Sequence, residues 1–242
     1  MPSCAGETNE NCRRTRARAS FRHTPHEPLR LLNPRSIAVV GASADRSKAG
    51  SQALQYEYRA VNLRREEHLT PEYRRLNPQG LVPALVVEGR VMTQSPAIIE
   101  WIEETWPHSP LLPRDAQGRA QVRAMAAIVG CDIHPLNNRR VLEMLRKRFG
   151  CDEASVNEWC VHWIAAGFDA IETILQEDRS RVGFCFGQGP TLADAYLVPQ
   201  VESARRFGVD LARGPAILEV DGNCGRTEPF RLAAPSNQLD AS

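Results

Sequence analysis

Apolar positions divide the chain into a short part with strand-like patterns and a long part with helical spacing. The mainly apolar residues 82–87 and the segment 90–93 flank a Glu-Gly pair, which predicts a β-hairpin. Residues 36–40 form a short apolar run before a glycine turn, and residues 56–63 alternate and are rich in β formers. We predict a strand in each of these two segments.

Helical signals follow the hairpin. Ser95 stands where a helix N-cap is expected, with Pro96 at the first helical position. We predict a helix from there to about Glu104, ended by the prolines of a linker at residues 107–114. A brief helix is also expected at residues 47–54.

The rest of the chain has helical spacing. Pro135 interrupts one predicted helix, and another is expected from Asn138 to Phe149. A long helix carries one apolar stripe, made of Val156, Trp159, Cys160, Trp163, Gly167, Ile171 and Leu175. From Pro229 we expect an extended tail. The predicted fold class is therefore a small α/β domain followed by an all-α domain.

Composition excludes several classes of function. The 242 residues are 42% hydrophobic and 24% charged, with a net charge of +1, so we expect neither nucleic acid nor a membrane as a partner. The seven cysteines form no C-x-x-C pair, which predicts reduced thiols and no metal site. No signal peptide is evident in the arginine-rich N-terminus, so a cytoplasmic location is expected.

Two short motifs carry the candidate chemistry. Pro83 cannot donate to a strand ladder, and a proline here leaves the backbone N–H and C=O of the preceding residue open to a bound peptide. Ser95 offers a hydroxyl and a free N–H at the positive end of a helix dipole, which suits a carboxylate. Alone, each has a commoner structural meaning, an edge-strand proline and a plain cap. Together they predict a cradle for a small peptide with an α-carboxylate.

These motifs lie within a longer resemblance. Residues 71–83, 131–138 and 191–201, and the flanking chain from about 56 to 240, resemble the zeta-class glutathione transferases, the maleylacetoacetate isomerases. The resemblance implies a glutathione transferase fold, with a thioredoxin-like domain before a helical one. It also implies a homodimer that uses glutathione as cofactor to isomerise maleylacetoacetate, a small-molecule substrate, from cis to trans.

The resemblance further implies roles for particular residues. The backbone of Val82 would pair with the cysteinyl part of glutathione, and Gln94 and Ser95 would hold its γ-glutamyl end. His134 and Asn138 would approach the tripeptide from the helical domain. As alternatives, His134 is an exposed residue at a kink and Asn138 is the N-cap of the resumed helix.

Four further residues have assigned roles. Arg206 would face a substrate carboxylate, or it is a solvated charge near a helix end. Pro83 is assigned to the turn itself, where the Val-Pro bond of thioredoxin-like folds is cis. Thr191 and Asp194 resemble a capping box, and we assign them to structure and not to catalysis.

The catalytic residue cannot be assigned. Members of the family begin with a strand and a Ser-Ser turn whose hydroxyl activates the thiol of glutathione, and no Ser-Ser pair occurs in this sequence. Residues 29–52 instead resemble the start of the CoA-binding domain of acyl-CoA synthetases. If residues 36–54 replace the missing strand and helix, Ser43 is a candidate substitute for the catalytic serine.

The expected organisation has five parts, with three hypotheses for function. The parts are a disordered basic arm at 1–28, a CoA-binding-like fragment at 29–54, an incomplete thioredoxin-like domain at 55–106, a helical domain at 115–228 and a tail at 229–242. The first hypothesis is a glutathione-dependent isomerase. The alternatives are a non-catalytic scaffold that binds glutathione and a CoA-binding module.

Overall fold

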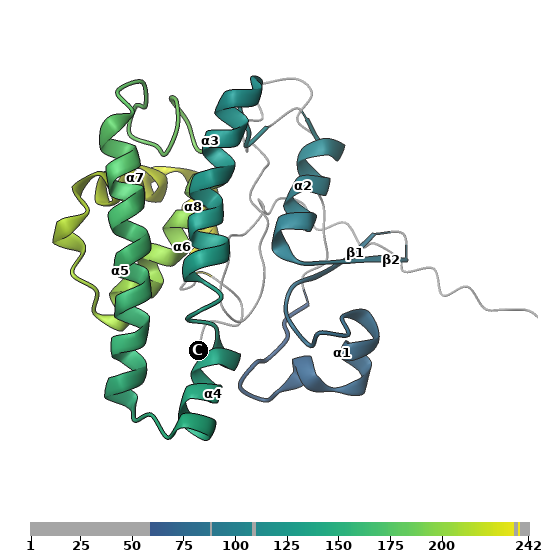
Figure 1. Ribbon diagram of the computed structural model, residues 1–242. Coiled ribbons are helices and arrows are strands. Elements are labelled where there is room, and N and C mark those ends of the chain that lie inside the picture. The colour runs from purple at the N-terminus through teal and green to yellow at the C-terminus, as the bar shows by residue number, and fades with distance from the viewer. Residues whose placement is uncertain (1–58, 88, 108–109, 235–236, 238–242) are drawn as a thin grey trace, which may run out of the picture.

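A small unit stands beside a larger group of helices in the computed structural model, which describes residues 59–87, 89–107, 110–234 and 237 (Figure 1). The small unit contains η1 (Glu67–Leu69), α1 (Pro71–Leu76), β1 (Ala84–Val87), β2 (Arg90–Thr93) and α2 (Ser95–Thr105). The larger unit contains α3 (Ala116–Ala127), η2 (Ile128–Ile133), α4 (Arg139–Phe149), α5 (Glu153–Glu177), α6 (Leu192–Phe207), η3 (Leu211–Arg213), α7 (Pro215–Arg226) and α8 (Glu228–Ala233). The strand expected at 36–40 and the helix expected at 47–54 lie outside the described residues.

The predicted hairpin is confirmed. β1 and β2 pair antiparallel, with Ala84 opposite Thr93 and Val87 opposite Arg90. Gly89, in the turn, has a φ of 80°, which glycine adopts readily. β1 begins at Ala84, two residues later than expected, because Pro83 has no N–H to donate to the ladder.

The strand expected over residues 56–63 is absent from the part of that range that the structure describes. Asn62 makes a turn there instead. Its side-chain oxygen accepts the N–H groups of Arg64 and Arg65, at 3.0 and 3.1 Å, and its backbone C=O accepts the N–H of Glu67 at 3.2 Å. These local bonds occupy groups that a strand ladder would use, so the chain turns into η1.

The larger unit packs around one apolar core. Val122, Cys160 and Val201, from α3, α5 and α6, have no exposed surface. Close packing of α5 on η2 depends on Gly167, because a Cβ there would lie 2.3 Å from Cδ1 of Ile133. Any larger residue at position 167 would therefore force the Ile133 side chain or the two elements to shift.

The apolar stripe predicted on α5 is correct at its ends and displaced in its middle. Trp159 and Trp163 are only partly buried, whereas Ile164 and Phe168 are buried in their place. The buried positions follow steps of three and four residues, as a straight helix requires.

A buried carboxylate caps α6. Asp194 accepts hydrogen bonds from the N–H and hydroxyl of Thr191, both at 2.7 Å, and from the N–H of Cys185 at 2.9 Å. Burial raises the pKa of Asp194 above its usual range, while these hydrogen bonds act in the opposite direction. Thr191 and Asp194 therefore tie the start of α6 to the loop before it.

A second buried carboxylate caps α7 from a distance. The residue before α7 is Gly214, which has no side chain to cap the helix. Glu172, from the middle of α5, accepts the N–H groups of Ala216 and Ile217 at 3.0 and 2.9 Å. These two hydrogen bonds join the start of α7 to a residue that lies 44 and 45 positions earlier in the chain.

The extended tail expected from Pro229 is wrong for its first residues. Glu228–Ala233 form helix α8, and Phe230 and Ala233 are buried against the core. Pro229 lies in the first turn of α8, where the missing N–H of proline costs no helical hydrogen bond. Among the described residues, no helix is long and apolar enough to cross a membrane.

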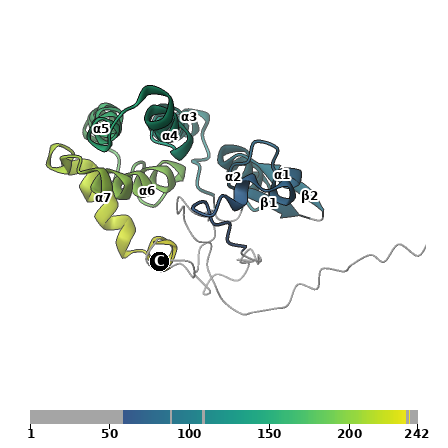
Figure 2. The same ribbon diagram turned by 90° about the horizontal axis from the view of Figure 1, so that it is seen from below.

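Contacts of α2 with α3 and with the linker hold the small unit against the helical unit, and the two units lie side by side in Figure 2. Glu100 on α2 makes a two-point ion pair with Arg123 on α3, at 2.8 and 2.9 Å. Glu103 on α2 accepts the N–H of Leu111 at 2.9 Å, and the C=O of Leu111 accepts the N–H of Leu192 at 2.9 Å. The linker is therefore bound to both units.

We expect Asp194→Ala to lower the free energy of unfolding by about 3 kcal/mol or more, since it leaves three buried donors without an acceptor. The matched control is Asp115→Ala, which removes the more exposed cap of α3, bonded to the N–H of Gly118 at 2.7 Å. That change should cost about 1 kcal/mol. Denaturant unfolding measures both, and equal losses would contradict the central role given to Asp194.

Candidate functional site

The loop before β1 is built around the carbonyl oxygen of Leu81. This oxygen accepts the hydroxyl of Tyr73 at 2.8 Å and the side-chain amide of Asn77 at 2.6 Å. Asn77 is only 2% exposed, and its own side-chain oxygen accepts the N–H of Gln79 at 3.1 Å. Two donors from α1 and its end therefore fix the position of the next residue, Val82.

Val82 presents free backbone groups beside the hairpin. The Val82–Pro83 peptide is cis, and the ladder of β1 begins only at Ala84. Within the described residues, neither the N–H nor the C=O of Val82 has a hydrogen-bond partner. Both groups can therefore pair with the backbone of an added peptide, as in strand addition.

The start of α2 differs by one residue from the prediction. The N-cap is Gln94, whose C=O accepts the N–H of Ile98 at 3.0 Å, so Ser95 is the first helical residue and not the cap. Gln94 has a φ of 71°, unusual for a residue with a side chain, and its amide donates to the side-chain oxygen of Gln79. The Ser95 hydroxyl has no hydrogen-bond partner in the described part of the chain.

Strand register brings these two motifs together. Because Ala84 pairs with Thr93, the residues before Ala84 and those after Thr93 emerge at the same end of the hairpin. The hydrogen bond from Gln94 to Gln79 closes this end. Val82 and Ser95 therefore share one surface, where free backbone groups lie next to the positive end of the α2 dipole. We call residues 77–83 and 94–97 the cradle.

His134 and Asn138 lie in the helical unit. His134 ends the π-helical turn η2, and its N–H donates to the C=O of Val129 at 2.8 Å. Asn138 is the N-cap of α4, because its side-chain oxygen accepts the N–H of Arg140 at 3.2 Å. No hydrogen bond among the described residues joins either side chain to the cradle, so their ligand roles stay predictions.

Arg206 lies close enough to His134 to affect it. Although His134 keeps an exposed face, surrounding atoms displace water from its ring and lower its pKa, and the positive charge of Arg206 lowers it further. The guanidinium of Arg206 also stacks over the ring of Phe207, 4.8 Å from its centre. Its assignment to a substrate carboxylate stays a prediction.

Several expected features fall outside the described residues. Ser43 and the CoA-binding-like fragment at 29–52 are among them. Among the residues that are described, no three His, Cys, Asp or Glu side chains gather closely enough to hold a metal ion.

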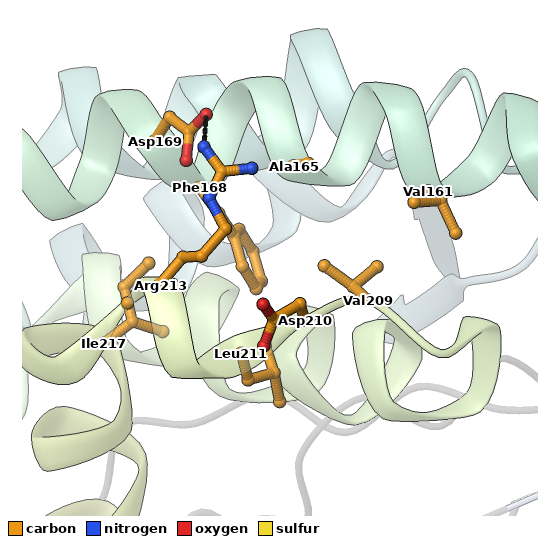
Figure 3. Close-up of a pocket in the computed structure, with 10 residues that line it drawn as sticks. Val161, Ala165, Phe168, Asp169, Val209, Asp210, Leu211, Arg213 and Ile217 are labelled. Carbon is orange, nitrogen blue, oxygen red and sulfur yellow. Dashed lines mark hydrogen bonds and ion pairs between the residues drawn. The ribbon is translucent and has the colours of Figure 1, made fainter.

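A separate cavity of about 110 Å³ lies between α5, η3 and the start of α7 (Figure 3). Its wall is mainly apolar, with side chains such as Val161, Phe168 and Ile217. An ion pair of 2.9 Å joins Arg213 and Asp169 beside it. It contains no cradle residue, so it is not the site that the sequence predicts.

Tyr73 and Asn77 were not predicted as site residues. Both belong to the segment that resembles the family, but that resemblance assigned them no role. Asn77 precedes a proline, an arrangement typical of turns, and this signal could have marked it as a residue that shapes the loop.

Comparison with known proteins agrees with this geometry. The family model "Glutathione S-transferase, N-terminal domain" matches residues 52–105. A maleylpyruvate isomerase of Ralstonia sp is 60% identical over 191 residues, which cover 79% of this chain and 90% of that protein. The maleylacetoacetate isomerase of Pseudomonas aeruginosa is 48% identical over 192 residues, covering 78% and 88%.

Solved structures give the same result. The holo structure of a maleylpyruvate isomerase, described as a bacterial zeta-class glutathione S-transferase, has a TM-score of 0.77 and 60% identity, covering 78% of this chain and 89% of that one. A maleylacetoacetate isomerase from Anaeromyxobacter dehalogenans with bound GSH has a TM-score of 0.69 and 42% identity, covering 78% and 87%. The chain belongs to the glutathione S-transferase family and, within it, to the zeta class.

Two histidines near the site make stability depend on pH. Burial lowers the pKa of His68, with a further lowering by Arg139, and the pKa of His134 is lowered as described above. The unfolded chain therefore binds more protons than the folded chain once the pH falls through the unfolded value of about 6.5. Stability should be complete above that value and decrease below it.

We expect the free energy of unfolding to fall as the pH is lowered from about 7.5 to about 5.5. The double substitution His68→Gln and His134→Gln should flatten this dependence, and each single change should flatten part of it. Denaturant unfolding across the pH range measures the slope. A double variant with the slope of the parent chain would contradict the assignment.

Proposed function

We propose that the chain binds glutathione in the cradle and catalyses the glutathione-dependent cis–trans isomerisation of maleylacetoacetate or a close analogue. The observation that carries the proposal is the unpaired backbone of Val82 beside the free start of α2. The isomerase names of the relatives, and the glutathione bound in one of the similar structures, support it.

The residues of the cradle fit the parts of glutathione. The N–H and C=O of Val82 would pair with the cysteinyl unit, and Ser95 would bind the γ-glutamyl carboxylate with its hydroxyl and N–H. Gln94 has a φ of 71° at the turn into α2, and its side-chain amide donates to Gln79. Its backbone and side chain would therefore lie at the edge of the same surface. His134 and Asn138 would complete the site from the helical unit.

Bound glutathione supplies the thiol nucleophile for the isomerisation. The chain's own contribution would be to hold the tripeptide, to bind a substrate carboxylate through Arg206, and to stabilise the thiolate with a hydroxyl donor. No Ser-Ser pair is present for the last task, and Ser43 is the candidate that we propose. We also propose a homodimer that works in the cytoplasm.

A second function is favoured by one observation. The family model matches only from residue 52, and the serine turn expected before that point is not in the sequence. A chain that holds glutathione without activating its thiol would be a binding scaffold. The CoA-binding module has no comparable support.

Isomerisation of maleylacetone by the purified chain, with and without glutathione, tests the proposal. We expect turnover that requires glutathione. Ser95→Ala should raise the Kd for glutathione about tenfold, since a hydrogen bond to a charged group is lost. Ser155→Ala, at the start of α5 and away from the cradle, is the matched control and should leave the Kd unchanged.

Ser43→Ala separates the two functions. If Ser43 activates the thiol, this change should remove most turnover while glutathione still binds, and Ser47→Ala should retain full turnover. Full turnover in the Ser43 variant would reject Ser43. Binding without turnover in the parent chain would establish the scaffold, and absence of binding by folded protein would reject both functions.

A further inference from the structure

Arg139 contacts three partners with three different nitrogens. Its Nη1 donates to the C=O of Leu63, its Nη2 lies 3.8 Å from Oε1 of Glu66, and its Nε donates to Oε1 of Glu143 at 2.6 Å. Glu143 is one turn further along α4 and orients the guanidinium. Leu63 and Glu66 belong to the small unit, so Arg139 joins the two units.

The segment that Arg139 holds is internally braced. The side chain of Glu67 accepts the N–H of Asn62 at 2.7 Å, which closes the turn from its other end. Thr70 then caps α1 and accepts the N–H of Tyr73 at 3.3 Å. Residues 62–70 therefore move with α1, and we call them the η1 segment.

The η1 segment packs directly on the cradle. A Cβ added at Gly80 would lie 3.1 Å from the carbonyl oxygen of His68 and 3.2 Å from Cδ2 of Leu69, so the two segments are in close contact and a side chain there would displace these neighbours slightly. Gly80 has a φ of 61°, which also favours glycine. The residue after it, Leu81, is the one that Tyr73 fixes through its carbonyl oxygen.

On its other side, Arg139 begins α4 directly after Asn138. The guanidinium thus connects the helix start that carries Asn138 to the segment that supports Leu81 and Val82. Asn138 is the residue directly before Arg139, and the η1 segment is followed directly by α1, which carries Tyr73. A change in the Arg139 contacts would therefore alter the distance between the two halves of the site.

We propose that Arg139 is a positioning residue for glutathione, which fixes the η1 segment on the start of α4 and so sets the spacing between Val82 and Asn138. The inference rests on the proposed function, because it deepens the description of the same site. The role proposed for Arg139 is to set this spacing through its protein partners Leu63, Glu66 and Glu143. Arginine reaches these partners from three separate nitrogens of a planar fork, a spread that the compact ammonium of lysine reproduces only in part.

The test measures the Kd for glutathione by calorimetry and, separately, amide hydrogen exchange across residues 61–69 without glutathione. We expect Arg139→Gln to raise the Kd about fivefold, the upper range for a partly exposed ion pair. It should also speed exchange in the η1 segment. In turnover assays, the KM for glutathione should rise with little change in kcat.

Matched variants make the outcome specific. Arg148→Gln, on the same helix, changes an exposed arginine that has no ion pair among the described residues, and it should match the parent chain. Glu66→Gln should produce part of the effect, and combining it with Arg139→Gln should add less than the two single effects together. Arg139→Lys should recover only part of the affinity.

Two results distinguish failure of the proposed function from failure of the positioning role. A parent chain that binds no glutathione rejects the proposed function. A parent chain that binds, together with an Arg139→Gln variant of unchanged Kd and unchanged exchange, rejects the positioning role. If Arg139→Gln does not fold, Glu66→Gln against Arg148→Gln gives the same decision.

Discussion

The carbonyl oxygen of Leu81 is the point on which the small unit depends. Tyr73 and Asn77 both donate to it, and the buried Asn77 also shapes the turn that follows α1. Its position determines where Val82 lies, and the lack of an N–H on Pro83 then delays the ladder until Ala84. The N–H and C=O of Val82 consequently have no hydrogen-bond partner among the described residues.

Buried carboxylates and polar contacts hold the helical unit together and join it to α2. Asp194 and Glu172 each satisfy helix-terminal N–H groups from within the core, where an unpaired donor would be costly. The linker is held between Glu103 and Leu192, and the pair of Glu100 with Arg123 fixes α2. The two units are therefore joined by polar contacts between specific groups.

Local patterns predicted much of the fold. The hairpin, α2 and the long helices follow from alternation, from helical spacing and from proline positions, which act over a few residues. Asn138 was recognised as a possible cap for the same reason. The family, and with it glutathione as ligand, followed from the residues around Val82 and from those near Thr191.

Long-range partners account for what could not be predicted. Hydrogen bonds of Asn62 form a turn where the alternating pattern predicted a strand. Residues 229–233, predicted as the start of an extended tail, belong to α8, in which Phe230 is buried. Glu172 caps a helix more than 40 residues away, at sequence separations of 44 and 45. Arg139 reaches Leu63 across 76 residues. No short window of sequence contains both members of such pairs.

The most direct test of the account is a map of amide hydrogen exchange on the whole chain with and without glutathione. The account predicts slower exchange in peptides that cover residues 77–85, 94–98 and 134–139 when glutathione is present, because these carry the two sides of the site. Protection confined to α5, η3 and α7 around the separate cavity, with no change in the cradle, would contradict it.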